Sequence, residues 1–405
     1  MTLSNGFRRV ILLWLAWAGI LIAFQTLVSE RYQPNRPDRA LEWTPGETAR
    51  TSQRGRPYLL DPFMNNQVAW DSEYYLSIAT VGYDDTDVLS AHTPEGRLPL
   101  NYAFFPLYPL VMSVVRVPFT LVTDTPIAAS AAAGVLIALL GTLGGMIALY
   151  DLARQDLGED GALRAVFYLL IFPSAFFLAQ VYTEGLFIGL AFGSLALLRR
   201  QKLLYAALLA ALATLTRSVG VLLIVPLAFA WLNAIDWKQF RLTPALIGRG
   251  VLVLAPLIAY GVWRLALGHQ FTLVEENYFG RALFNLESFS RGVTFAFEQF
   301  IAGENRQMRV YYGMEFAAVA LAVVTSLFTL RRYPGLSLFG LLAIVISVTS
   351  GAPQSLIRYM LPIPAIYLAL GRWGRAQVFD RAWTFLSLLV FGMQVSLFTF
   401  DMWVA

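Results

Sequence analysis

The sequence predicts an all-α integral membrane protein, a bundle of about eleven transmembrane helices with a large first extracytoplasmic loop. Three observations lead to this prediction. Hydrophobic residues make up 57% of the chain and charged residues 14%, whereas soluble domains average about 25% charged residues. Apolar runs that are long enough to cross a bilayer recur along the sequence,. Short basic clusters separate these runs, which is how membrane topology is encoded.

Composition limits the chemistry that the chain can carry. The absence of cysteine excludes disulfides, thiolate nucleophiles and thiolate metal ligands,. His92 and His269 are the only imidazoles and lie far apart in the sequence. We therefore expect no metal and no cofactor, and catalysis by carboxylate, tyrosine, lysine or arginine side chains. The net charge of +4 is not a nucleic-acid signature, so the expected surroundings are membrane lipids.

The chain begins with an apolar run over residues 10–28 that is long enough to span the bilayer,. Arg8 and Arg9 precede this run, and no clear small-residue cleavage site follows it. This pattern favours an uncleaved first span with a cytoplasmic N-terminus. The polar sequence that follows forms a first extracytoplasmic loop, residues 30–125, within a single membrane domain of residues 1–405.

The first loop divides into two parts by composition. Residues 33–56 are rich in proline and arginine, and we expect them to be irregular. Residues 61–83 are expected to be ordered. The acids Glu73, Asp84 and Asp85 in and just beyond this part are expected to be solvated.

Residues 101–122 are apolar but contain three prolines and Arg116. If this segment does not cross the membrane, the later basic clusters all face the cytoplasm; if it crosses, they all lie outside. The positive-inside rule prefers the first solution, so we expect an interfacial or re-entrant helix pair here. The later predicted spans are 126–150, 162–180, 184–198, 203–216, 218–232, 245–267, 312–330, 336–350, 359–370 and 382–400, with a second extracytoplasmic loop at 268–311 and the C-terminus outside.

The run over residues 203–232 has Arg217 at its middle. As a single span it would place this charge at the bilayer centre, at a cost of roughly 2.5 to 3.5 kcal/mol or more. It would also reverse the side of every later basic cluster. Two short spans that meet at residues 216–220 avoid both problems, and we predict that arrangement.

The densest group of carboxylates and aromatic residues follows Trp70. Asp71, Tyr74, Tyr75 and Ile78 fall on one face of a helix, which Gly82 is expected to end,. The pattern predicts a short amphipathic helix at the membrane surface with a carboxylate at its head. An interfacial anchor in which Asp71 serves only as an N-cap remains the alternative.

The predicted topology places four polar motifs on the extracytoplasmic side. They contain Asp71, Glu184, Arg217 and Arg358. Carboxylates and arginines at the mouth of a helical bundle suggest a site for an anionic, polar-headed substrate, because the arginine fork donates two parallel hydrogen bonds to phosphate. Simpler roles stay open: Glu184 as an N-cap, Arg217 as a structural partner of Glu184, and Arg358 as an orientation charge.

These residues also carry a family resemblance. The pieces are WDSEYYLSIATVGY at 70–83, NYAFFPLYP at 101–109, FPSAFFLAQVYTEGLF at 172–187 and LTRSVG at 215–220. In order and rough spacing the chain resembles the polytopic mannosyltransferases of the GPI mannosyltransferase 2 (PIG-V-like) family and their bacterial relatives. The likeness covers the N-terminal half; beyond it, only hydropathy and the piece SLIRYMLPIPAIYLAL at 355–370 agree.

The resemblance implies a GT-C type glycosyltransferase fold whose large first external loop bears the catalytic carboxylate, which matches Asp71. The family's Tyr-Ser-Glu-Ser motif stands here as Tyr-Thr-Glu-Gly at 182–185, and its Arg-Ser-Asn-Gly run as Arg-Ser-Val-Gly at 217–220. The predicted site has Asp71 as catalytic base, with Arg358, Arg217, Glu184, Tyr182, Trp70, Tyr74 and Asn101 around the donor phosphate and substrate.

The expected function is transfer of a hexose, mannose by resemblance, from a polyprenyl or dolichyl phosphate sugar to a hydroxyl of a glycan or glycolipid acceptor. The reaction would invert the anomeric centre at the outer membrane face. A transporter or flippase of lipid-linked sugars is the main alternative, although the sequence shows no clear inverted repeat. A scaffold subunit without chemistry is a third reading, and it predicts that Asp71 tolerates substitution.

Overall fold

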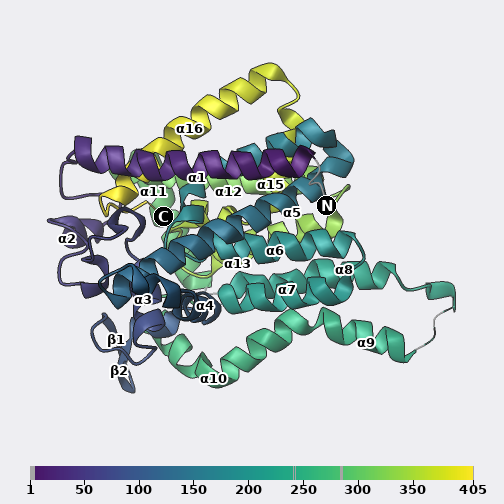
Figure 1. Cartoon of the computed structure of the whole chain (residues 1–405), viewed down its shortest axis with the longest axis horizontal. Coiled ribbons are helices and arrows are strands. Elements are labelled where there is room, and N and C mark those ends of the chain that lie inside the picture. Colours follow the sequence, from purple (N-terminus) through teal and green to yellow (C-terminus); the bar gives the residue numbers. More distant parts are fainter. Residues whose placement is uncertain (1–4, 240, 242, 283–285, 405) are drawn as a thin grey trace.

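The computed structural model describes residues 5–239, 241, 243–282 and 286–404. Helices that run side by side in one bundle make up most of it (Figure 1). The described residues contain one small sheet, in which β1 (Ser90–Thr93) and β2 (Gly96–Pro99) pair in antiparallel fashion. The predicted all-α integral membrane fold is confirmed, with this hairpin as a minor addition.

The bundle is built from helices of very different lengths. The longer ones are α1 (Asn5–Arg31), α5 (Pro126–Leu170), α6 (Glu184–Arg199), α7 (Leu203–Thr216), α8 (Ile224–Asn233), α9 (Pro244–Val253), α10 (Ala255–Asn277), α11 (Leu286–Ala302), α12 (Arg306–Thr329), α13 (Pro334–Thr349), α15 (Pro364–Trp373) and α16 (Gln377–Thr399). The short ones are α2 (Thr44–Thr48), α3 (Ser72–Thr80), α4 (Leu107–Val115) and α14 (Leu356–Met360). Short 3-10 segments join them at Pro57–Leu59, Asn65–Gln67, Leu100–Ala103, Val117–Leu121, Ala175–Ala179, Ser218–Leu223 and Trp237–Gln239.

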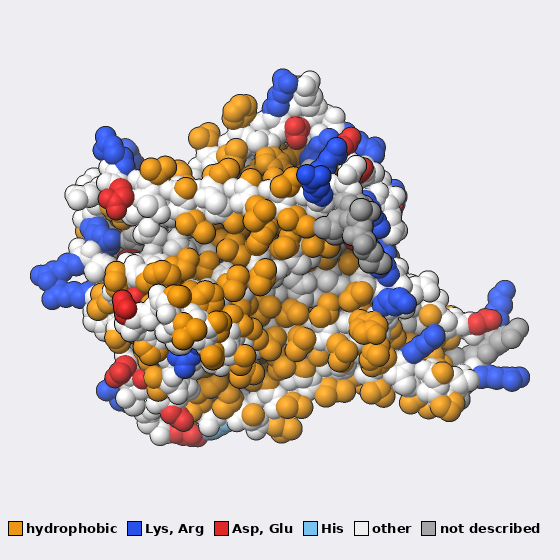
Figure 2. Space-filling view, in the orientation of Figure 1, with side chains coloured by type: hydrophobic (Ala, Val, Ile, Leu, Met, Phe, Trp, Pro, Cys, Tyr) orange, Lys and Arg blue, Asp and Glu red, His pale blue; other side chains and the backbone are white. Residues whose placement is uncertain are grey.

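The bundle has two polar ends separated by an apolar middle. One end, which we name the loop end, carries α2, α3, α4 and the β1–β2 hairpin (Figure 1). At the far end Asp156 forms ion pairs of 2.8 Å with Arg199 and 2.6 Å with Arg332. Figure 2 shows hydrophobic side chains spread over the surface between these ends, with most of the charged ones toward the ends. This band is the surface that lipid tails cover in a membrane protein.

Four helices in the described residues are long and apolar enough to cross a bilayer, namely α1, α5, α12 and α16. A fifth span is obtained if α9 and α10, which are bent by 54° to each other, are taken together. The other predicted spans correspond to shorter or interrupted helices. The predicted number of about eleven spans is therefore not confirmed, and α10 itself continues to Asn277 rather than ending at the predicted residue 267.

The predicted span 162–180 shows how such an interruption arises. Helix α5 is bent at Gly158, whose φ of 74° is outside the helical range. Trp14 and Trp17 on α1 donate hydrogen bonds to Leu139 and Leu170, one on each arm of α5. The second arm therefore comes back beside the first and ends at mid-bundle. Non-helical backbone at that depth is tolerated only where protein surrounds it, and the following segment is buried.

The loop end departs from prediction at α3. We expected a surface helix with one polar face, but seven of its residues are buried, including Glu73, Tyr74 and Tyr75. Glu73 is 1% exposed and Asp85 is 5% exposed, so the prediction that these two acids are solvated is wrong. The predicted stop is confirmed, because Gly82 has a φ of 126° and the helix ends at Thr80.

The break predicted at Arg217 is also confirmed. Helix α7 ends at Thr216, and Arg217 is extended with φ of −152° and ψ of 141°, so the apolar run breaks at Arg217 as predicted. Residues 101–122 form short helices joined at Arg116 rather than one long helix. Residues 33–56 are largely irregular, as expected, but they also hold α2 and the buried side chains of Thr44 and Thr48.

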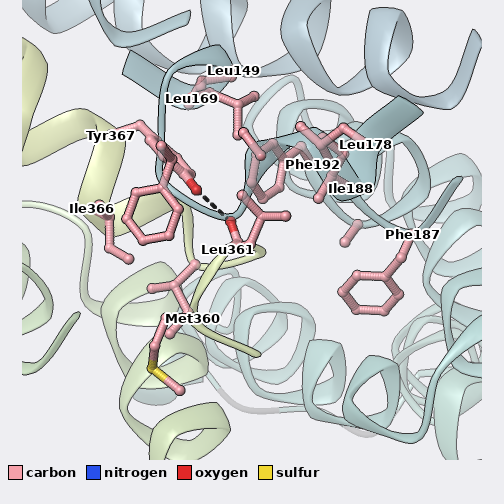
Figure 3. Packing of buried hydrophobic residues seen from close by; sticks show 14 of the residues in the cluster. Leu149, Leu169, Leu178, Phe187, Ile188, Phe192, Met360, Leu361, Ile366 and Tyr367 are labelled. Carbon is pink, nitrogen blue, oxygen red and sulfur yellow. Dashed lines mark hydrogen bonds between the residues drawn. The ribbon is translucent and has the colours of Figure 1, made fainter. Parts of the chain in front are cut away.

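Close backbone contact between α5 and α6 holds the centre of the bundle. A Cβ added at Gly141 would lie 2.5 Å from the carbonyl oxygen of Gly185, and one added at Gly189 would lie 2.5 Å from that of Gly141. Small residues permit this approach, as is common between membrane helices. Large side chains of α6 and α15 pack in the neighbouring core (Figure 3).

We predict that Gly141→Ala lowers the free energy of unfolding by about 1–3 kcal/mol, because the new methyl group must push backbone apart. Gly144→Ala is the matched control on the same helix, since its Cβ would lie 3.8 Å from the Cα of Gly189 and fits. Thermal unfolding of both variants in detergent measures the difference. Equal melting temperatures for the two variants would show that this contact does not limit packing.

Candidate active site

Four polar side chains from distant parts of the sequence form one continuous chain at the loop end. Arg358 Nη1 donates to Asp71 Oδ2 at 2.8 Å, and Arg358 Nε lies 3.6 Å from Glu184 Oε1. Arg217 Nη1 forms an ion pair with the same Glu184 oxygen. Negative and positive charges therefore alternate from Asp71 through Arg358 and Glu184 to Arg217. The structure brings together the four residues that topology placed on one side.

Asp71 is placed by the turn that leads into α3. Its backbone N–H donates to the hydroxyl of Tyr182 at 3.2 Å, and that hydroxyl donates to the carbonyl of Ala69 at 3.1 Å. Between them, Trp70 has a φ of 51°, a strained value for a large side chain,. The Asp71 side chain makes no capping bond to α3. The alternative role as a simple N-cap is therefore wrong, and the carboxylate is directed to Arg358.

Glu184 and Arg217 lie at the ends of two helices that break near the site. Glu184 begins α6 and is 1% exposed, with Oε2 lacking a hydrogen-bond partner in the described residues. Arg217 follows the last residue of α7 and also donates to Thr183 Oγ1 at 3.0 Å. The structural pairing of Arg217 with Glu184, one of the simpler readings of the sequence, is thus present. It does not exclude a role in binding, because Arg217 keeps further donors.

A third arginine, which the predicted site did not include, completes the positive side. The guanidinium carbons of Arg217, Arg281 and Arg358 lie 5.6, 5.5 and 5.4 Å from the ring centroid of Tyr359. Arg281 Nη1 also donates to the Tyr359 hydroxyl at 2.7 Å. All three guanidinium groups are thus within cation–π range of one aromatic ring. Tyr359 follows Arg358 directly and Arg281 lies in the second predicted loop, but no local pattern in the sequence pairs Arg281 with Tyr359.

Two of the remaining predicted site residues, Trp70 and Tyr74, lie beside this chain of charges. Trp70 packs edge-on against Trp43 at 5.9 Å and Trp403 at 5.3 Å between ring centroids. Tyr74 is buried and stacks on Phe104 at 4.7 Å. Their rings build the wall beside Asp71.

Asn101 belongs to a separate polar network. It is fully buried and donates to Ser77 Oγ at 2.8 Å and to the Gly82 carbonyl at 3.0 Å. These bonds hold the C-terminal end of α3. The contacts described for Asn101 are therefore with α3 and its terminal turn, and not with the four charged residues.

A buried acid connects α3 to the first loop. Glu73 lies 3.4 Å from Arg56, which also pairs with Glu47 at 2.8 Å. Burial raises the pKa of the Glu73 carboxyl from its ordinary value near 4.5 to about 7, although Arg56 opposes this shift,.

Metal-ligand clusters of three or more His, Asp or Glu side chains do not occur among the described residues.

The N-terminal part of the chain matches a known family. The model of the family described as "Mannosyltransferase (PIG-V)" matches residues 8–245. Among curated proteins, the GPI alpha-1,6-mannosyltransferase 2 of Cricetulus griseus is 31% identical over 167 residues. The match covers 40% of this chain and 31% of that protein, so the chain aligns with about a third of this relative. Asp71, Glu184 and Arg217 lie within the residues that the family model matches.

The chain is distantly similar to solved structures over most of its length. One is ArnT from Cupriavidus metallidurans bound to undecaprenyl phosphate, with a TM-score of 0.47 and 16% identity over 96% of this chain and 76% of that one. Another is the archaeal oligosaccharyltransferase AglB from Archaeoglobus fulgidus in complex with an inhibitory peptide and a dolichol-phosphate, with a TM-score of 0.45 and 14% identity. It covers 95% of this chain and 56% of that one.

The raised pKa of Glu73 predicts a pH dependence of stability. The folded state keeps the carboxyl proton of Glu73 at pH values where the unfolded chain has lost it. The contribution of Glu73 to the free energy of unfolding is therefore complete below about pH 4.5 and is lost as the pH rises through 7,. The loss amounts to about 3 kcal/mol at most. Glu73→Gln should therefore gain stability relative to wild type between pH 5 and pH 7.5.

Thermal unfolding at several pH values measures this difference. Glu47→Gln is the control, because Glu47 shares Arg56 but is exposed. It should keep the loss of stability with rising pH, shifted only slightly downward because the charge of Glu47 adds to the raised pKa of Glu73. A difference between Glu73→Gln and wild type that stays constant with pH would contradict the prediction.

Proposed function

The chain belongs to the PIG-V mannosyltransferase family, and on this premise we propose that it transfers a hexose, mannose in the first place, from a polyprenyl or dolichyl phosphate sugar. The acceptor is a hydroxyl of a glycan or glycolipid, and the reaction takes place at the extracytoplasmic face of the membrane. The observation that carries the proposal is the ion pair between Asp71 and Arg358. It supports the proposal because the residue proposed as base and the residue proposed to bind phosphate are in direct contact.

Asp71 acts as general base in this proposal. Its side chain is 27% exposed, whereas that of Glu184, the other carboxylate in the chain of charges, is 1% exposed. The carboxylate takes the proton of the acceptor hydroxyl while the hydroxyl oxygen attacks the anomeric carbon of the donor. The bond between that carbon and the phosphate oxygen breaks on the opposite face, so the sugar is transferred with inversion.

The lipid phosphate leaves with the electron pair of the broken bond and gains negative charge. Arg358, Arg217 and Arg281 offer planar forks of donors that suit phosphate. Such donors lower the barrier when they are already aimed at the position where charge develops. Arg217, Arg281 and Arg358 gather around Tyr359, so several guanidinium groups are available to one anionic ligand. No metal or cofactor is part of the proposed reaction.

The ion pair also suggests how the base becomes free. Arg358 Nη1 is bound to Asp71, and Arg358 Nε has no hydrogen-bond partner among the described residues. A donor phosphate that binds this guanidinium competes with Asp71 for its N–H groups. Donor binding then releases the carboxylate toward the acceptor, which couples base activation to the presence of donor.

We predict that Asp71→Asn lowers transfer of mannose from polyprenyl phosphate mannose by at least about 100-fold, because the amide cannot accept the proton. Donor affinity should be kept. The assay uses purified protein in lipid with a panel of glycan and glycolipid acceptors. Asp87→Asn, an exposed aspartate in the same loop, is the control and should transfer at the wild-type rate. Full activity of Asp71→Asn would refute the role of base, and Glu184 would be tested next.

For Arg358→Ala we predict at least about tenfold weaker binding of polyprenyl phosphate, since a charge-assisted contact to the phosphate is lost. Binding is measured directly by titration calorimetry, so the result does not depend on the acceptor. Arg97→Ala removes an exposed arginine from β2 and should bind as wild type does. Unchanged affinity in Arg358→Ala would remove the phosphate assignment.

A further inference from the structure

Helix α12 contains a fully buried acid that the proposed reaction does not use. Glu315 is 0% exposed and lies in one of the four helices that are able to span the membrane. An ionisable residue in such a helix is costly and marks a function by default. The described residues offer Glu315 no ion-pair partner within 4.0 Å. It also lies outside the residues 8–245 that match the family model.

The contacts of Glu315 lead directly to the segment that carries Arg358. Glu315 Oε2 accepts a hydrogen bond from the Ile357 N–H at 2.7 Å. One turn earlier on the same face of α12, the Tyr311 hydroxyl accepts from the Ser355 N–H at 3.1 Å,. Both N–H groups belong to the start of α14, where a helix has no internal acceptors for them. Two side chains of α12 therefore hold the backbone on either side of residue 356.

The other end of this segment is held by the hydrophobic core. The Tyr367 hydroxyl donates to the Leu361 carbonyl at 2.6 Å, as Figure 3 shows. Met360 and Leu361 are fully buried among side chains of α5, α6 and α15 (Figure 3). Arg358 thus lies between two parts of the chain that are held in place, the start of α14 and the buried residues Met360 and Leu361.

The segment cannot hold this shape by itself. Helix α14 has five residues, too few to be stable alone,. Ser355 has a φ of 64°, a strained conformation for a residue other than glycine,. The direction of the Arg358 side chain therefore depends on contacts from outside α14. Two of them hold the preceding residue: Glu315 accepts from the Ile357 N–H, and Ser174 Oγ donates to the Ile357 carbonyl at 3.0 Å.

We propose that Glu315 is a positioning residue, which acts through the Ile357 N–H to aim Arg358 at Asp71 and at the donor phosphate. This inference rests on the proposed role of Arg358 as a phosphate ligand. Glu315 touches neither donor nor acceptor. What it supplies is an acceptor oxygen for a backbone N–H at the start of a helix, where no internal acceptor is available.

The test compares two substitutions of different chemistry. Glu315→Leu removes the acceptor and should weaken binding of polyprenyl phosphate by about tenfold. Glu315→Gln keeps an acceptor oxygen and should restore binding to within about threefold of wild type. Thr325→Val is the matched control, since Thr325 is buried in the same helix and its hydroxyl donates only to carbonyls of that helix, those of Leu321 and Ala322. This variant should bind polyprenyl phosphate normally.

A double-mutant cycle with Arg358→Ala separates positioning from general support of the fold. If Glu315 acts through Arg358, Glu315→Leu should cause no further loss of affinity once Arg358 is alanine. Multiplicative losses in the double variant, or normal binding by Glu315→Leu, would overturn the inference while leaving the proposed function intact. Normal binding by Arg358→Ala alone would instead overturn the assigned role of Arg358, and the inference with it.

If Glu315→Leu does not fold, the cycle is run with Tyr311→Phe, which removes the acceptor for the Ser355 N–H. The expected loss is about threefold in the wild-type background and none with Arg358→Ala. An equal loss in both backgrounds would overturn the inference. Melting temperatures of all variants are measured to show that the folded proteins are compared.

Discussion

The arrangement of the site depends on the contact between Asp71 and Arg358, which are 287 positions apart in the sequence. The arginine is 8% exposed, so its desolvation is costly unless carboxylates lie beside it,. Asp71 and Glu184 provide them from two other parts of the chain. Such pairs add little net stability, because desolvation cancels much of the attraction. The geometry is better explained by what the exposed carboxylate and the arginine do together.

Each charged residue is delivered by a break in a helix. Asp71 precedes α3, Glu184 begins α6 after an irregular segment, Arg217 separates α7 from the next turn, and Arg358 lies in the single turn of α14. Broken helices leave backbone groups without partners, and the structure satisfies them with side chains such as Tyr182, as expected inside a membrane bundle. The same bonds that satisfy the backbone also fix the directions of the charged side chains. The hydrogen bonds that the broken helices require therefore also build the site.

The sequence was informative where hydropathy and charge act locally. The break at Arg217 followed from the cost of a central charge, and the grouping of Glu184, Arg217 and Arg358 with Asp71 followed from the distribution of basic clusters. Burial of α3 was missed, because its aromatic and polar residues are typical of a surface helix until packing partners are known. The pairing of Arg281 with Tyr359 depends on contacts between segments 78 positions apart, which no local pattern encodes. Glu315 had a usable signal, an acid inside the predicted span 312–330, but its partner is a backbone N–H that sequence cannot specify.

The most direct measurement is an experimental structure of the protein with polyprenyl phosphate bound in a lipid nanodisc. The account predicts that the phosphate oxygens contact the guanidinium group of Arg358 and that the Asp71 carboxylate has moved away from Nη1 toward open space. It also predicts that Ile357 keeps its bond to Glu315. A phosphate bound elsewhere, with the Asp71–Arg358 pair unchanged, would contradict the central claim that this ion pair is the phosphate-gated centre of the active site.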